Sequence, residues 1–220
     1  MQPYEHPIRL LLVDDHQILR DGLKKAIQQE SDFELAGEAD NGREALVLSQ
    51  EIKPDIIIMD VSMQGLNGIE ASRQIIKQNP GQKIIGLSMH SDKHYVMGML
   101  KAGVCGYILK TNAFEELAQA VRKVFSGESY VSSQITGIII DSAIGTSSGP
   151  ITDGKEELSS REIEILQLIA EGKNTAYMAG QLNISKRTVE NHRQSLRNKL
   201  KLNTIADLTR YAIRKGIVSP

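Results

Sequence analysis

Three aspartates stand directly after two apolar runs of the sequence. Asp14 and Asp15 follow the run IRLLLV, and Asp60 follows DIIIM. Parallel strands of one sheet end at the same edge, so two such strands would bring the three carboxylates together. Clustered carboxylates repel one another and need a cation nearby. The sequence offers Lys110, directly after another apolar run, and the carboxylate oxygens suit a hard divalent ion such as Mg²⁺.

A hydroxyl completes this predicted ring of polar groups. Ser88 ends the apolar run KIIGL, which has the same strand character. With Mg²⁺, Lys110 and the Ser88 hydroxyl aimed at one point, the site would neutralise the charge of a transferring phosphoryl group. A carboxylate beside that point would accept the group, so the sequence indicates phosphoryl chemistry at this edge.

Short apolar runs alternate with helical patterns through the first 126 residues. The strand-like runs are 8–13, 33–39, 55–59, 83–87 and 104–109, and the helical patterns are 17–29, 41–50, 67–78, 93–101 and 113–126. Three of the runs are continuously apolar, which is typical of parallel strands covered by helices on both faces. Right-handed crossovers then give a doubly wound, three-layer α/β fold.

A wholly helical pattern begins at Ser159, where SSRE has the spacing of a capping box. The segments NTAYMAGQL, NIS and KRTVENHRQSLRNKL predict a helix, a turn and a second helix, and a last helix follows over 203–214. We therefore expect a first domain over 1–127, a linker over 128–155 and a small all-α helix-turn-helix domain over 156–220. The linker is rich in Gly, Ser, Thr and Pro over 142–155. Residues 132–141 could form a short helix before this stretch.

The net charge also differs between the two predicted domains. Residues 1–150 carry 14 Lys and Arg against 19 Asp and Glu, a net charge of −5, whereas residues 151–220 carry 12 against 8, a net charge of +4. Ten of the basic residues and only two acids lie between Lys173 and Lys215. Such a concentration favours a polyanionic partner, although a solvated helix face can also be basic.

Composition narrows the class of protein further. With 220 residues, 40% of them hydrophobic, the chain can bury a core, and its single cysteine, Cys105, cannot form an internal disulfide. Its apolar runs are shorter than a membrane span, and the N-terminal stretch lacks the pattern of a signal peptide. We expect a cytoplasmic protein without membrane contact.

The acidic motifs, taken together, resemble the receiver domain of two-component response regulators over residues 8–126. A DD pair, D-x-x-M, a strand-ending Ser and G-Y-x-x-K occur in the order of that family. The resemblance implies a flavodoxin-like (βα)5 fold, a histidine kinase as phosphoryl donor and Asp60 as phosphoacceptor. It implies that Mg²⁺ is bound by Asp15, Asp60, the backbone carbonyl of Ser62 and, through a water, Asp14. Lys110 corresponds to the phosphate-binding lysine, Ser88 to the switch hydroxyl and Tyr107 to the switch aromatic.

Some of these residues could instead have a purely structural role. Asp14 and Asp15 can cap the following helix, Asp60 can form a turn, and Tyr107 can be an ordinary sheet residue. We expect His16, His90 and His94 to meet solvent or hydrogen bonds, because their sequence spacing is not that of metal ligands. The chain departs from the family pattern at Gln64 and Thr111, where many receivers have proline.

The motifs LSSREIEIL, SKRTVENH and RNKLKL resemble the LuxR-type DNA-binding domain of NarL/FixJ-type regulators. The resemblance implies double-stranded DNA as partner, read by homodimers on two half-sites. It weakens at Ala176-Tyr177-Met178, where Lys-Glu-Ile is usual. Base-reading candidates are Glu190, Asn191 and Gln194; candidates for phosphate or groove-wall contact are Lys186, Arg187, Thr188, His192, Arg193 and Arg197.

The sequence therefore predicts a phosphorylation-controlled, DNA-binding transcription regulator that is not an enzyme. A receiver that works without phosphorylation is the first alternative, and the intact set of Asp15, Asp60 and Lys110 argues against it. An aspartyl-phosphate enzyme of haloacid-dehalogenase type would need a second acid two residues after the nucleophile, where this chain has Ser62. A LuxR regulator gated by a small molecule would need a different first half.

Overall fold

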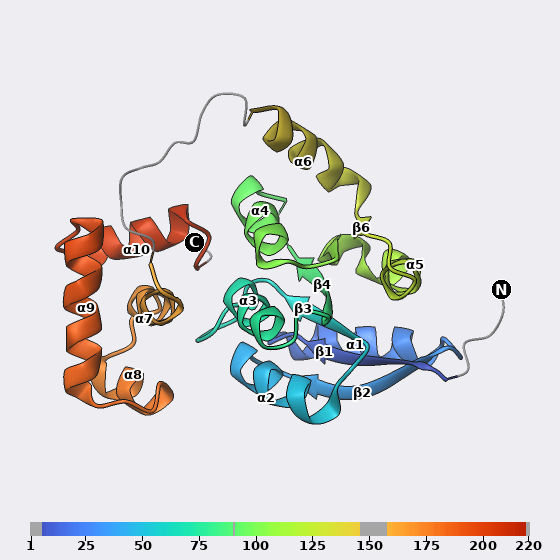
Figure 1. Ribbon diagram of the computed structural model, residues 1–220, viewed down its shortest axis with the longest axis horizontal. Coiled ribbons are helices and arrows are strands. Elements are labelled where there is room, and N and C mark those ends of the chain that lie inside the picture. The colour runs from blue at the N-terminus through green and yellow to red at the C-terminus, as the bar shows by residue number, and fades with distance from the viewer. Residues whose placement is uncertain (1–5, 90, 146–157, 219–220) are drawn as a thin grey trace. The chain divides into compact units, whose positions relative to one another are not determined.

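The computed structural model describes residues 6–89, 91–145 and 158–218 (Figure 1). The chain divides into two compact units, Met1–Gly145 and Thr146–Pro220. In the described residues, every helix is too short or too polar to cross a membrane.

The first unit is built around one parallel sheet with the strand order β2-β1-β3-β4-β5-β6. Its strands are β1 (Ile8–Val13), β2 (Phe33–Ala39), β3 (Ile56–Asp60), β4 (Lys83–Ser88), β5 (Gly106–Leu109) and β6 (Tyr130–Val131). Its α-helices are α1 (Gln17–Gln28), α2 (Gly42–Ile52), α3 (Gly68–Gln78), α4 (Lys93–Ala102), α5 (Ala113–Phe125) and α6 (Ser133–Gly145). The direction of strand addition reverses between β1 and β3, which is where ligands bind in such sheets.

Two hydrophobic cores cover the two faces of the sheet. On one face, Leu23 of α1 and Leu117 of α5 pack against the sheet with Ile56 and Ile58 of β3. On the other face, buried residues of α2, α3 and α4 pack in one core with Ile57 and Met59 of β3 and with residues of the neighbouring strands. Burial on both faces explains the continuously apolar strands, and the predicted three-layer arrangement is confirmed.

The structure differs from the expected boundaries at the end of the first unit. β6 adds a sixth strand, and α6 follows it directly with Ile135 fully buried against the same core as α4. The stretch 128–145 therefore belongs to the first unit instead of the predicted linker, and the other linker residues, 146–155, lie outside the described residues. Periodicity could not find β6, because a strand of two residues has no pattern of its own and is defined by its pairing with β5.

Within residues 158–218, the second unit has four helices around one core: α7 (Ser160–Ala170), α8 (Thr175–Gln181), α9 (Lys186–Leu200) and α10 (Ile205–Arg214). The capping box predicted at the start of α7 is present, with Ser159 and Glu162 bonded to each other's backbone N–H. Asn183, with φ +50°, makes the turn between α8 and α9. Met178 of α8 and Val189 of α9 enter the shared core, which fixes the two helices of the helix-turn-helix.

Candidate functional site

Lys110 and two buried aspartates form the centre of the acidic site at the carboxyl edge of the sheet. The ammonium Nζ of Lys110 lies 2.8 Å from Asp14 Oδ2 and 2.7 Å from Asp60 Oδ2. All three side chains are almost fully buried, whereas Asp15 beside them is a quarter exposed. The strand ends of β1, β3 and β5 thus bring together the groups that the sequence predicted to meet.

The acidic site places three carboxylates around the single ammonium of Lys110, so it carries more negative charge than this lysine balances. Burial raises the pKa of Asp60 to about 6, the Lys110 ammonium opposes the rise, and Asp14 adds to it. A further cation would stabilise the ionised carboxylate. The site therefore favours a divalent ion, and the hard oxygen donors of the three aspartates fit Mg²⁺.

His16 meets both solvent and hydrogen bonds, as expected, and its hydrogen-bond partners are the acids of this cluster. Its Nδ1 lies 2.9 Å from Asp15 Oδ1 and 3.2 Å from Asp14 Oδ1, and its backbone N–H donates to Asp14 Oδ1 at 2.8 Å. The ring remains largely exposed. Its position directly after the aspartate pair was the only available signal, because side-chain direction at a helix start cannot be read from spacing.

The loop after β3 is tied to the acids through its backbone. Ser62 N–H donates to Asp60 Oδ1 at 3.1 Å, and Gln64 N–H donates to Asp15 Oδ2 at 3.4 Å. The next residue, Gly65, has φ +79°, a backbone conformation that side chains disfavour. The chain thus places the Ser62 backbone beside the acids without proline at position 64.

Ser88 and Tyr107 lie on the neighbouring strands β4 and β5, and both side chains are buried. Burial raises the pKa of Tyr107 to about 12, and a side-chain hydrogen bond with Ser88 opposes part of that rise. The two predicted switch residues are therefore in direct contact.

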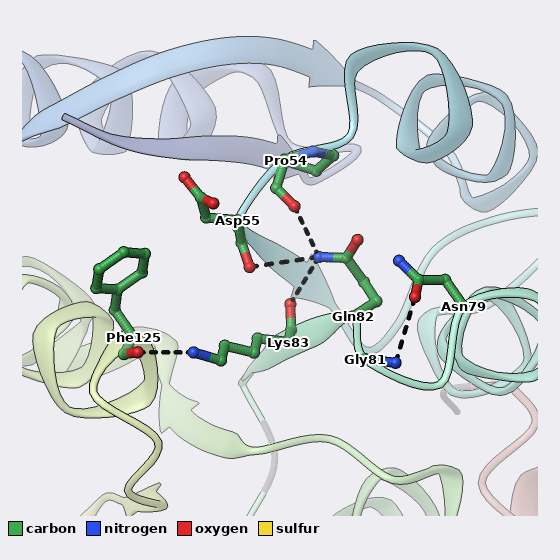
Figure 2. Close-up of a pocket in the computed structure, with 7 residues that line it drawn as sticks. All are labelled: Pro54, Asp55, Asn79, Gly81, Gln82, Lys83 and Phe125. Atoms are coloured by element: carbon green, nitrogen blue, oxygen red, sulfur yellow. Dashed lines mark hydrogen bonds between the residues drawn. The ribbon is translucent and has the colours of Figure 1, made fainter. Parts of the chain in front are cut away.

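A cavity of about 260 Å³ lies at the opposite, amino edge of the sheet, where β3 and β4 begin (Figure 2). The Gln82 amide donates to the carbonyls of Pro54, at 3.0 Å, and Lys83, at 3.3 Å. Lys83 Nζ donates to the Phe125 carbonyl at 2.6 Å. These polar groups bond to the protein itself, so we place the candidate site at the other edge.

In the second unit, α9 presents two polar stripes. Val189, Leu196 and Leu200 are buried, and the opposite side carries a stripe of exposed residues at helical spacing: Arg187, Asn191, Gln194 and Asn198. Gln194 donates to Asn198 Oδ1 at 3.0 Å, so Asn198 joins the predicted base-reading face, although the sequence analysis did not single it out. The neighbouring stripe comprises Lys186, Glu190, Arg193 and Arg197.

The surroundings of the other two candidates on α9, Thr188 and His192, argue against a direct contact of either side chain with DNA. Thr188 Oγ1 lies 2.8 Å from Oγ of Ser185, the residue that caps α9. His192 is half-buried on the flank that also carries Ser195. Their assignment as groove-wall residues stays a prediction.

Glu162 fixes α9 to the start of α7. Its carboxylate accepts hydrogen bonds from Ser195 Oγ at 2.7 Å, from Lys199 Nζ at 3.0 Å and from the Ser159 N–H at 2.8 Å. Burial raises the pKa of Glu162, but these hydrogen bonds outweigh burial and lower it from 4.5 to about 2.

We expect Glu162→Gln to destabilise the second unit by about 3 kcal/mol at neutral pH, since one pKa unit corresponds to about 1.4 kcal/mol. Because the folded pKa is below the unfolded one, this stability is fully present above pH 4.5 and is lost as the pH falls towards 2. Amide hydrogen exchange in α7 and α9 of the full chain measures it. The same change at the exposed Glu115 should leave these amides unaffected, and an equal effect there would contradict the role of Glu162.

Two family models match the chain. One, described as the response regulator receiver domain, matches residues 10–122, and the other, described as bacterial regulatory proteins of the luxR family, matches residues 156–212. The first covers the acidic pocket and the second covers all of α7, α8 and α9.

The chain is also similar to named proteins. The transcriptional regulatory protein LiaR of Bacillus subtilis is 37% identical, over 96% of this chain and 100% of its own. A two-component response regulator of the LuxR family from Aurantimonas sp. SI85-9A1 is 32% identical, with a TM-score of 0.60 over 63% of this chain and 99% of that chain. The structure of RcsB in complex with DNA has the same fold, with a TM-score of 0.60 and 23% identity over 96% of this chain and 99% of that chain.

Proposed function

We infer that phosphorylation of Asp60 controls DNA binding by this chain, which belongs to the response regulators that join a receiver domain to a LuxR-type DNA-binding domain. Members of this family regulate transcription, and the chain is a regulator of that kind. The observation that carries the proposal is the contact of the Lys110 ammonium with both Asp14 and Asp60 at the carboxyl edge of the sheet.

Asp60 is the nucleophile of the proposed reaction. One of its carboxylate oxygens attacks the phosphorus of a phosphohistidine on a histidine kinase, so that a P–O bond forms and the P–N bond breaks. The histidine nitrogen leaves with the electron pair of the broken bond and takes up a proton from solvent. Lys110 then pairs with a phosphoryl oxygen and holds the group in place.

Asp15, Asp60 and the Ser62 carbonyl would hold Mg²⁺, with Asp14 contributing through a water. When bound, the ion neutralises charge on the phosphoryl oxygens. Support for this assignment comes from Asp14, Asp15 and Asp60, whose carboxylate ligand atoms lie within 4.8 Å of one another.

Ser88 and Tyr107 transmit the effect of phosphorylation from the acidic site to the helices of the first unit. The Ser88 hydroxyl turns to donate to a phosphoryl oxygen, which alters its hydrogen bond with Tyr107 and frees that ring to move. Tyr107 belongs to the same hydrophobic core as Met99 of α4 and Ile135 of α6. Its movement therefore changes the surface formed by α4 and α5, the helices that follow β4 and β5.

Binding to DNA then follows from the association of two copies of the chain. Homodimers that read two half-sites about one helical turn apart are typical of helix-turn-helix regulators. We assign base reading to Asn191, Gln194 and Glu190 and phosphate contact to Lys186, Arg187 and Arg197 of α9. The last helix, α10, provides one contact between the copies.

Sedimentation of the full chain with Mg²⁺, with and without beryllofluoride as a phosphoryl mimic, tests this function. We expect a shift from monomer towards dimer on addition of beryllofluoride and no shift when Asp60 is replaced by Asn. An unchanged sedimentation coefficient in the wild-type chain, together with unchanged DNA affinity, would contradict control by Asp60.

A further inference from the structure

Thr175, Glu190 and Arg193 form a closed hydrogen-bonded cluster between α8 and α9. Thr175 Oγ1 donates to Glu190 Oε1 at 2.6 Å. Arg193 Nη1 donates to Thr175 Oγ1 at 2.8 Å and to Glu190 Oε1 at 3.3 Å. Thr175 is the only member on α8, and the other two lie one turn apart on α9.

The Thr175 hydroxyl has a specific place in this cluster. A hydroxyl has one donor hydrogen, and Thr175 gives it to the carboxylate while it accepts from the guanidinium. Oε1 of Glu190 therefore carries both hydrogen bonds, while more than half of the side chain is exposed to solvent. The carboxylate is therefore anchored through one of its two oxygens.

Anchoring matters because a carboxylate near DNA is repelled by phosphates. Such a group contributes to binding where it accepts a hydrogen bond from a base amino group, and cytosine N4 is the donor that suits it in the major groove. A freely rotating glutamate would lose rotamer entropy on making that contact. Arg193 offsets the negative charge, and the Thr175 hydroxyl fixes the rotamer before DNA arrives.

We propose that Thr175 is a positioning residue that determines base preference through Glu190. It holds Oε1 so that Oε2 faces the DNA and selects a base pair with an amino donor, cytosine above the others. This inference rests on the proposed base contact of Glu190. It also explains why Arg193, whose side chain is largely buried, serves the carboxylate more than a phosphate.

Selection of binding sites by the full chain from a library of random duplex DNA tests the inference without a known operator. We expect the wild-type chain to enrich cytosine at one position of each half-site and Glu190→Ala to lose that preference. Thr175→Val keeps the side-chain shape but removes the hydroxyl, so we expect it to lower cytosine preference at that position about fivefold, within the range of a single base contact. Thr175→Ser restores the hydroxyl and should retain the preference.

Affinity for unrelated DNA separates positioning from a loss of structure. We expect it to change less than about twofold in Thr175→Val, because contacts to phosphates are independent of sequence. If Thr175→Val keeps the cytosine preference that Glu190→Ala removes, or if Thr175→Ser loses the preference as Thr175→Val does, the role of Thr175 is overturned while the Glu190 contact stands. If Glu190→Ala leaves the selected sequences unchanged, the Glu190 contact itself is overturned, and the inference with it.

Discussion

Asp60→Asn is expected to reduce Mg²⁺-dependent labelling of the chain by a small phosphodonor to background. The amide oxygen is a far weaker nucleophile than the carboxylate, and the substitution also removes one negative charge from the predicted metal site. Asn has nearly the same shape as Asp, so the side chain still fits between Lys110 and the Ser62 N–H. Labelling with a radioactive or mass-detected phosphoryl group measures the loss.

Asp21→Asn is the matched control for this experiment. Asp21 is exposed on α1, accepts a hydrogen bond from Gln17 and lies outside the acidic cluster. This variant should be labelled like the wild-type chain. Labelling of Asp60→Asn at the wild-type level would place the phosphoacceptor at another residue.

The buried position of Asp60 predicts a pH dependence for the same reaction. Because burial raises its pKa to about 6, the nucleophilic carboxylate becomes depleted as the pH falls below 6. Labelling at low Mg²⁺ concentration should decline over this range. Added Mg²⁺ should move the decline to lower pH, because a bound cation favours the ionised carboxylate. The donor's own hydrolysis at each pH is measured alongside.

The affinity of the chain for DNA is expected to fall by about 10³ between 50 and 200 mM salt. Lys186, Arg187 and Arg197 of α9 make no ion pair within the described part of the chain, whereas Arg193 pairs with Glu190 and Lys199 with Glu162. Two copies then contribute about six phosphate contacts, each adding about 0.9 to the slope of log affinity against log salt. Titrations by fluorescence anisotropy at several salt concentrations give the slope.

The ion pair of Lys199 provides a control for the salt experiment. Lys186→Gln should reduce the slope by about one unit for each copy bound. Lys199→Gln should leave the slope unchanged, because this lysine already pairs with Glu162. A flat salt response of the wild-type chain would contradict the phosphate contacts altogether.

The sequence predicted most of the secondary structure of the chain because its signals are local. β1 and β2 begin and end at the predicted residues, and α4 and α8 lie within one residue of the predicted bounds. Continuous apolar runs and capping residues report the conformation of their own segment, so spacing alone finds them. The same reasoning failed at β6, whose two residues become a strand only by pairing with β5.

The chemical groups of the acidic site were also predictable, because parallel strands must end at one edge. The sequence by itself determined that Asp14, Asp60 and Lys110 would converge there. Only the tertiary structure decided that the His16 ring turns towards the acids and that the Thr175 hydroxyl reaches Glu190 on another helix. Those contacts depend on side-chain rotamers and on the distance between packed elements, and no periodicity along the chain records either of them.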